Sequence, residues 1–306
     1  MISNEIALGL LFLFQTGFGV LGNSFLMGLY IVTFFTGSRL RPIDLLLSHL
    51  AFVNDLVLLF KGIPQIMTTL GLTNFLDDVG CKLVFYCHKV ARDLSLCTTC
   101  LLSSFQAITL SPRSSWLAKL KARALKCIVP LFLLCWTFYL LTNYTILLYV
   151  KGPQGNKNTT EGQAFFYCVA TFPVSHNIAI HILTVSLPDV LCMGIMVRTS
   201  GYMVFVLYRH HQRAKYIHGN SLTPSGSLEI RATQTILLLV ILFVSFYSLN
   251  SILILCIPYA KSSWVVYTSA FLSTCFPTCS SFILIFSDSQ VGKYVLTLWE
   301  KMMIQF

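Results

Sequence analysis

Four ionisable side chains lie close together in an otherwise apolar stretch, and they are the strongest candidates for binding chemistry. They are His88, Lys89, Arg92 and Asp93. In a helix, His88 and Arg92 are four residues apart and Lys89 and Arg92 three apart, so each pair shares a face. Inside a membrane span, a charged group costs about 2.5 to 3.5 kcal/mol on insertion scales. Such groups therefore indicate function.

Lys61 and Asp189 lie in two other apolar stretches and extend this candidate ligand site. With Lys61 included, basic groups outnumber acids at this level, which favours an anionic ligand group. A structural alternative pairs Lys89 with Asp93 and Lys61 with another acid, so that the ion pairs position helices without touching ligand. Both interpretations stay open, as do the roles of Asp55 and Arg198.

The composition requires a membrane around these charges. The chain is 56% hydrophobic and 10% charged, with a mean hydropathy of +0.75, whereas a soluble domain carries about 25% charged residues. Soluble enzymes, disordered chains and nucleic-acid binders are therefore excluded. We find no Gly-x-Ser-x-Gly or His-Glu-x-x-His motif, so we expect no catalytic residue and no cofactor.

Apolar stretches long enough to cross a bilayer, about 20 residues each, occur repeatedly along the sequence. They are residues 6–35, 42–70, 81–110, 125–150, 181–208, 232–259 and 264–287. The sequence predicts an all-α membrane protein, with residues 1–306 as one domain of seven transmembrane helices. Residues 1–5 form a short N-terminal tail and residues 288–306 the C-terminal tail.

The distribution of Lys and Arg predicts the orientation of the chain. Most of those near span ends lie in the first, third and fifth connections and the C-terminal tail, whereas the alternate connections hold only Lys82, Lys151, Lys157 and Lys261. The positive-inside rule then places the N-terminus outside and the C-terminus in the cytoplasm. Most of the net charge of +10 is therefore explained by basic residues that orient the chain in the membrane. Asn158, in an Asn-Thr-Thr sequon of the second outer connection, is a candidate glycosylation site.

The eleven cysteines cannot all pair with one another, because their number is odd. Cys81 and Cys168 are both placed on the outer side, where a disulfide persists, and we expect them to be bonded. The remaining thiols fall within spans, and Cys97 and Cys100 are expected to be packing residues rather than metal ligands. His210, His211 and His218 have no acidic or Cys partner nearby, so no metal site is expected.

Seven spans, an outer N-terminus and a Cys at the start of the third span outline a G-protein-coupled receptor, and longer motifs narrow the resemblance. Residues 95–103 read Ser-Leu-Cys-Thr-Thr-Cys-Leu-Leu-Ser, residues 105–109 Phe-Gln-Ala-Ile-Thr and residues 231–239 Arg-Ala-Thr-Gln-Thr-Ile-Leu-Leu-Leu. Shorter matches include residues 61–64, Lys-Gly-Ile-Pro, and 276–278, Phe-Pro-Thr. Together these strings closely resemble the type-1 vomeronasal receptors, a mammalian pheromone receptor family.

The resemblance implies a chemosensory receptor in the plasma membrane. It implies a small, pheromone-like ligand in the outer half of the helix bundle and a heterotrimeric G protein of the Gi/Go type as partner. Phe105-Gln106-Ala107 stands where rhodopsin-like receptors usually have Asp-Arg-Tyr, and Asn54 replaces their sodium-site aspartate. The resemblance implies both departures as well, because the vomeronasal family shares them.

Basic residues on the cytoplasmic side are candidates for contact with the G protein. In residues 114–126, basic groups alternate with apolar ones, which is typical of a short amphipathic helix at the membrane surface. Anchoring to lipid headgroups is an equally good interpretation of this pattern. The candidate G-protein contacts are Arg113, Lys119, Lys121, Arg123, Arg209 and Arg213.

Two other functions compete with this one. A channel or transporter also carries intramembrane charges, but the sequence has no detectable inverted repeat or paired helices broken by Gly or Pro. A bitter-taste receptor is the nearest alternative among receptors. The strings at residues 95–103 and 231–239 favour the vomeronasal family over it.

Overall fold

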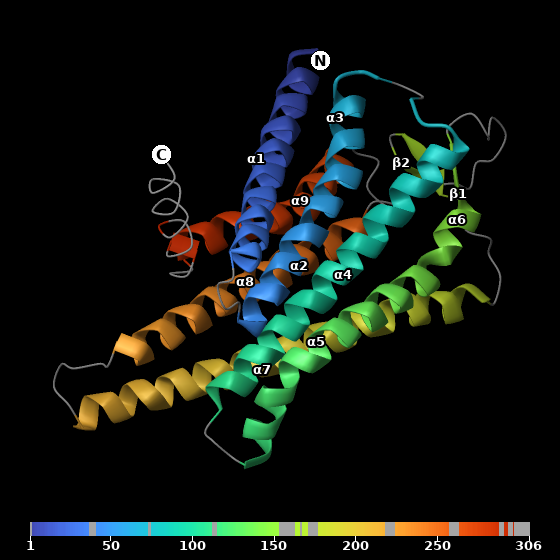
Figure 1. Ribbon diagram of the computed structural model, residues 1–306. Helices are drawn as coiled ribbons and strands as arrows, with labels where there is room; N and C mark the ends of the chain where they lie inside the picture. The colour runs from blue at the N-terminus through green and yellow to red at the C-terminus, as the bar shows by residue number, and fades with distance from the viewer. Residues whose placement is uncertain are drawn as a thin grey trace.

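The computed structural model confirms seven membrane-spanning helices. It describes residues 2–36, 41–72, 75–111, 115–152, 163–165, 167–170, 177–217, 224–256, 263–287, 291–292 and 296. Within that part of the chain, 7 helices are long and apolar enough to cross a membrane. Figure 1 shows them as an elongated bundle, with the N-terminus and the strands at the same end.

The first three spans agree closely with the stretches predicted from hydropathy. The first is α1 (Ile2–Phe35), and the third is α4 (Asp78–Leu110). The second consists of α2 (Pro42–Val57), a π turn (Leu58–Gly62) and α3 (Ile63–Thr69). Local signals fix two of the starts. Pro42 opens α2, a position where its missing N–H costs nothing. The Asp77 side chain caps α4 by accepting a hydrogen bond from the Gly80 N–H at 2.7 Å.

The fourth span is the one that differs most from the prediction. Helix α5 (Ser115–Thr142) already begins at Ser115, so residues 115–126 are its first turns rather than a separate surface helix. This part of the chain has no Pro or Gly before Pro130, and its Leu, Ala, Lys and Arg are good helix formers. A 3-10 turn (Asn143–Thr145) and the short α6 (Ile146–Tyr149) complete the span.

The last three spans extend past the predicted apolar stretches on at least one side. They are α7 (Asn177–Ile217), α8 (Pro224–Cys256) and α9 (Ser263–Ser287). Hydropathy marks only the part of a helix that contacts lipid, so polar turns such as the end of α7 are missed. In Figure 1, α7 and α8 run side by side and extend together beyond the rest of the bundle.

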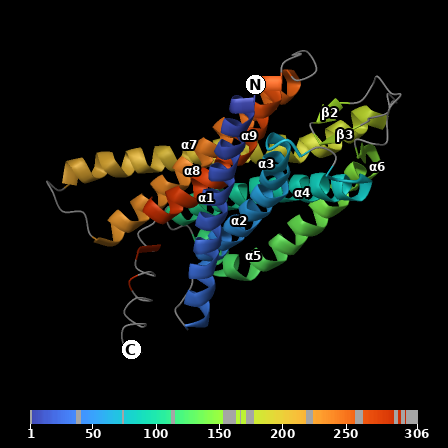
Figure 2. The same ribbon diagram turned by 90° about the horizontal axis from the view of Figure 1, so that it is seen from above.

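The core is formed mainly by α2, α4, α8 and α9. Leu50, Leu94 and Leu239 are fully buried there, and α4 runs through the middle of the bundle (Figure 2). In the apolar windows of α2 and α4, 61% of residues are buried inside the protein, against 11% for the spans at Cys127–Tyr149 and Ser186–Arg209. The outward faces of α5 and α7 are therefore left to lipid.

A small sheet covers the end of the bundle where α4 begins. Its strands β1 (Val150–Lys151), β2 (Gln163–Phe165) and β3 (Cys168–Ala170) are antiparallel in the order β1-β3-β2, with Phe165 opposite Cys168. A disulfide joins Cys168 to Cys81, as expected from the sequence. Both cysteines pack with Val150 and Tyr167 in a separate apolar cluster, and burial raises the pKa of the Tyr167 phenol. The sheet is thereby fixed to the first turn of α4.

Candidate functional site

The charged residues of α4 form a network with neighbouring helices. The Lys89 ammonium donates to both carboxylate oxygens of Asp93, at 2.6 and 2.7 Å. The Asn143 side-chain amide, from the turn after α5, donates to Asp93 at 3.0 Å and to the Tyr139 carbonyl at 3.0 Å. Asp93 is almost completely buried. The structure thus contains the Lys89–Asp93 pair that the structural interpretation expects.

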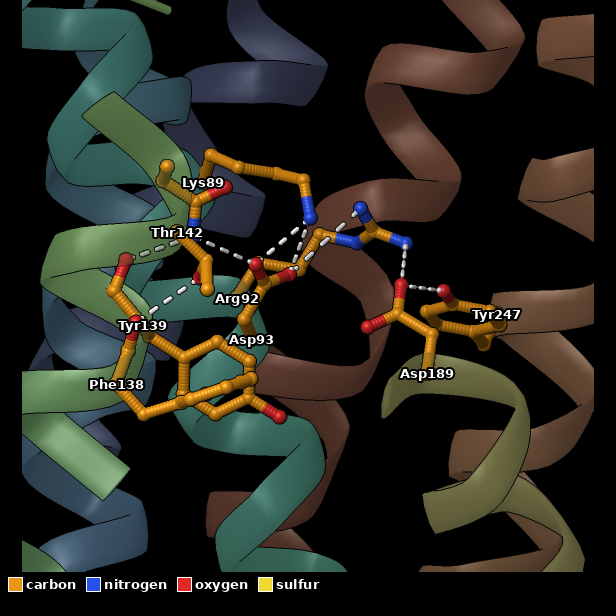
Figure 3. A network of polar contacts seen from close by, with 9 residues as sticks. Lys89, Arg92, Asp93, Phe138, Tyr139, Thr142, Asp189 and Tyr247 are labelled. Atoms are coloured by element: carbon orange, nitrogen blue, oxygen red, sulfur yellow. Dashed lines mark hydrogen bonds and ion pairs between the residues drawn. The ribbon is translucent and has the colours of Figure 1, made fainter. Parts of the chain in front are cut away.

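Arg92 points away from this pair, toward α7 and α8. Figure 3 shows its guanidinium between Asp93 on one side and Asp189 with Tyr247 on the other. Its nearest carboxylate oxygens are at 3.8 Å in Asp189 and 4.0 Å in Asp93, beyond hydrogen-bond distance. The guanidinium also lies 4.7 Å from the centre of the Tyr247 ring, and the Tyr247 hydroxyl donates to Asp189. The positive charge of Arg92 is therefore balanced by two carboxylates and one aromatic ring face, without a close ion pair.

An open cavity lies next to Arg92. It encloses about 400 Å³ of empty space, including its mouth, between α4, α8 and α9. Polar groups come from Arg92 and Ser95 on α4, Asn250 on α8 and Ser273 on α9. Asn250 accepts a hydrogen bond from Ser269 through its carbonyl oxygen, at 2.7 Å.

Aromatic side chains supply most of the remaining wall. Phe243, Phe246, Tyr247 and Phe276 all line the cavity, and the rings of Phe243 and Phe276 are packed edge to face with centres 4.6 Å apart. An apolar pocket with a few convergent polar groups is the usual form of a small-molecule site. The lining of the cavity therefore suits a small, largely apolar molecule that carries one or two hydrogen-bonding groups.

A chain of hydrogen bonds links two residues of the cavity wall, Ser95 on α4 and Pro277 on α9. The Ser95 hydroxyl donates to the Asn54 carbonyl oxygen at 2.8 Å, and the Asn54 amide donates to Ser280 at 3.0 Å. Ser280 donates in turn to the carbonyl of Pro277, which also lines the cavity. The amide of Asn54 thus joins α4 to α9 by donating and accepting at once, which an aspartate could not do.

Lys61 and His88 lie outside the Lys89–Asp93 network. In the described residues no carboxylate lies within ion-pairing distance of Lys61, so the predicted pairing of Lys61 with an acid is not found. His88 is within electrostatic reach of Lys61, and its Nδ1 is buried without a hydrogen-bond partner. The excess of positive charge expected from the sequence is therefore reduced to the charge of Lys61, because Asp93 offsets Lys89 and Asp189 offsets Arg92.

The predicted site residues fall into three groups. Lys89, Arg92, Asp93 and Asp189 come together, but only Arg92 lines the cavity. Lys61 and His88 lie apart from that network. Ser95, Asn143, Tyr247 and Asn250 were not predicted, although each is a polar residue in an apolar stretch, which is itself a signal of function.

The predicted glycosylation site and the predicted G-protein contacts are the remaining site residues. Asn158 and Arg113 are outside the described residues, and only the backbone is described for Lys119, Lys121, Arg123 and Arg213. The Arg209 side chain is exposed, near the end of α7 that extends beyond the bundle. Cys97 and Cys100 pack in the apolar core, as expected, and the Cys97 sulfur also lies 3.0 Å from that of Cys135.

Known receptors resemble this chain over nearly its full length. A human protein, "Vomeronasal type-1 receptor 4", is 42% identical over 303 residues, which cover 98% of this chain and 100% of that one. A zebrafish protein, "Olfactory receptor class A-like protein 1", is 32% identical over 286 residues, or 92% of this chain and 90% of that one. The crystal structure of squid rhodopsin has the same fold, with a TM-score of 0.71 at 15% identity over 99% of this chain and 87% of that one.

The family assignment rests on the whole length of the chain. The model of the "Vomeronasal organ pheromone receptor family" matches residues 6–297. This range contains all of the spans, the disulfide and the cavity. The chain therefore belongs to the vomeronasal organ pheromone receptor family, the type-1 vomeronasal receptors, and is a multi-pass G-protein-coupled receptor of the plasma membrane, not an enzyme.

Proposed function

We propose that this receptor detects a small, pheromone-like molecule in the cavity beside Arg92 and transmits the signal to a heterotrimeric G protein of the Gi/Go type. The observation that carries the proposal is the aromatic cavity with Arg92, Ser95 and Asn250 in its wall. Ser95 is also the first donor in the hydrogen-bond chain to Asn54 and Ser280. A ligand that changes the Ser95 rotamer changes the hydrogen bond from α4 to Asn54 of α2, which is itself bonded to Ser280 of α9.

Lys61 is not in the wall of this cavity, but its charge would favour a ligand whose anionic group reaches it. Arg92 has two carboxylates within 4.0 Å, whereas Lys61 has none within that distance among the described residues. A cation inside a span without a counterion is costly, and a ligand carboxylate or sulfate would reduce that cost. Lys61 is only partly buried and lies in the π turn, a local distortion that is frequent at functional sites.

Paired agonists separate the two cations. We expect Lys61→Met to weaken the response to a carboxylic acid about tenfold or more, a loss that corresponds to about 1.4 kcal/mol of binding free energy. The response to the neutral amide of the same acid should change little, because the amide carries no charge for Lys61 to attract. Arg92→Leu should weaken both responses alike, since it removes a group that holds Asp189. Lys61→Arg keeps the charge and should retain the preference for the acid. The readout is ligand-dependent signalling in reporter cells, normalised to surface expression.

Controls distinguish ligand binding from folding. Lys151→Met removes an exposed lysine at the sheet and should leave both dose-response curves unchanged. If Lys61→Met lowers the responses to acid and amide equally at normal expression, Lys61 has a structural role. Wild-type responses in both variants would remove Lys61 and Arg92 from the ligand site.

The G-protein partner is tested separately at the basic cytoplasmic surface. We expect a toxin that ADP-ribosylates Gi/Go α subunits to abolish the response, and neutralising Arg209 and Arg213 to lower its maximum at unchanged ligand potency. If the basic residues anchor lipid headgroups instead, the same substitutions will lower surface expression rather than maximum signalling. A response that persists after toxin treatment excludes the Gi/Go assignment.

A further inference from the structure

Two cysteines in different helices lie in contact inside the bundle. The sulfur atoms of Cys97 in α4 and Cys135 in α5 are 3.0 Å apart, and both thiols are free. A disulfide bond is about 2.05 Å long, so bonding requires an approach of roughly 1 Å. The two positions are 38 residues apart in sequence, and only the packing of α5 on α4 brings them together.

This thiol pair has no part in the site described above. Neither cysteine lines the cavity or contacts the Lys89–Asp93 network. Both are partly exposed, in contrast to Cys100 one turn further along α4, which is buried. A small uncharged oxidant that dissolves in the membrane can therefore reach them.

We propose that Cys97 and Cys135 are a site of reversible oxidation, at which a hydroperoxide such as hydrogen peroxide creates a second disulfide between α4 and α5. The sulfur of one thiol attacks a peroxide oxygen, the O–O bond breaks, and a sulfenic acid and one water form. The other sulfur then attacks the sulfenic sulfur; the S–S bond forms, the S–O bond breaks, and a second water leaves. Both sulfurs are oxidised, and the peroxide is reduced to two waters.

The new bond would link two helices that few hydrogen bonds join directly. Between α4 and α5, the described hydrogen bonds are from the Tyr86 hydroxyl to the Leu140 carbonyl, at 2.8 Å, and from Asn143, just after α5, to Asp93. Most of the apolar window of α5 faces away from the protein. Oxidation would therefore connect the helix that carries Arg92 covalently to a neighbour that it otherwise contacts only through non-covalent packing and these hydrogen bonds.

Mass mapping of the full-length receptor in membranes tests the proposal. After treatment with hydrogen peroxide, free thiols are blocked with N-ethylmaleimide and the protein is digested without reduction. We expect a cross-linked peptide that contains Cys97 and Cys135, absent from untreated receptor and lost again after mild reduction. The peptide that joins Cys81 and Cys168 should be present before and after oxidation.

Two substitutions make the result specific. Cys97→Ser should abolish the new cross-linked peptide, whereas Cys127→Ser, which removes an exposed free thiol of the same helix α5, should leave it unchanged. Surface expression of both variants is measured to confirm folding. The proposal is overturned if Cys97 and Cys135 are both alkylated after oxidation, or if the oxidised receptor contains Cys97 only in other pairings or as a higher oxide.

Discussion

At the residue scale, Asp93 is the residue on which most contacts of the intramembrane network depend. It accepts hydrogen bonds from Lys89 and from Asn143, and Arg92 lies 4.0 Å away. Its side chain is only 3% exposed, so its charge depends on these partners rather than on water. Removing one partner of such a pair leaves the other as an uncompensated buried charge.

We therefore expect Lys89→Met to destabilise the receptor by about 3 to 5 kcal/mol, seen as a lower temperature of thermal unfolding in detergent. Adding Asp93→Leu to Lys89→Met should recover much of this loss, because the double variant has no stranded charge. Lys151→Met, at the exposed sheet, is the control. Equal unfolding temperatures for Lys89→Met and Lys151→Met would show that the pair contributes no stability.

At the scale of elements, hydrogen bonds between side chains connect α4 to α8 and α7 near the end of the bundle opposite the sheet. The Gln106 amide donates to the Thr233 hydroxyl at 2.8 Å, and both side chains are buried. The Tyr202 hydroxyl of α7 donates to Ser111, the residue after α4, at 2.9 Å. These bonds are between neutral groups, so relative movement of the helices separates no opposite charges.

Loss of the bond between Gln106 and Thr233 should raise basal signalling. Interhelical hydrogen bonds in membrane proteins contribute about 0.6 kcal/mol on average, so we expect Thr233→Val to increase ligand-independent G-protein activity by roughly threefold. Thr109→Val is a matched control, since the Thr109 hydroxyl donates only within α4, to the Gln106 carbonyl. Unchanged basal activity in Thr233→Val at normal surface expression would contradict this role.

Most of the helices could be predicted from the sequence, whereas the contacts of the site could not. Apolar length determines where a chain crosses the bilayer, and it identified all of the spans. Hydropathy gives no information about backbone distortions or polar helix extensions, so the π turn and the early start of α5 were missed. The positions of Lys89 and Arg92 inside an apolar span marked them as functional candidates. Which carboxylate lies beside each of them depends on how the helices pack, and the sequence does not give that.

At the scale of the whole molecule, the disulfide joins the sheet to the bundle. Cys81 and Cys168 are separated by 87 residues in sequence and are both buried in the separate apolar cluster beside the sheet. We expect Cys81→Ser and Cys168→Ser each to reduce surface delivery severely, because loss of a native disulfide costs about 2 to 5 kcal/mol. The double variant should be no worse than either single one. Finding both thiols free in receptor from the cell surface would refute the pairing.

The orientation of the whole chain is tested at Asn158. We expect Asn158→Gln to abolish the shift in gel mobility caused by removal of N-glycans, because Asn158 is predicted on the outer side of the membrane. The second sequon, at Asn143, serves as an internal control: its amide nitrogen already donates to Asp93 and Tyr139, and its side chain is buried. A glycan that persists in Asn158→Gln would contradict the assignment.

The π turn at Leu58–Gly62 also has a consequence for how this receptor can be aligned with proteins that lack it. A single π turn holds one residue more than the α-helix it interrupts, so it is the structural trace of a one-residue insertion. Deleting Leu59 would restore a regular helix and leave α3 facing about the same neighbours, because the wider π turn takes up the extra residue. Without a gap at this point, an alignment would compare each residue from Lys61 to Thr69 with one that is offset by about 100° around the helix. A gap of one position in the second span therefore decides whether Lys61 is compared with the correct residue of a relative.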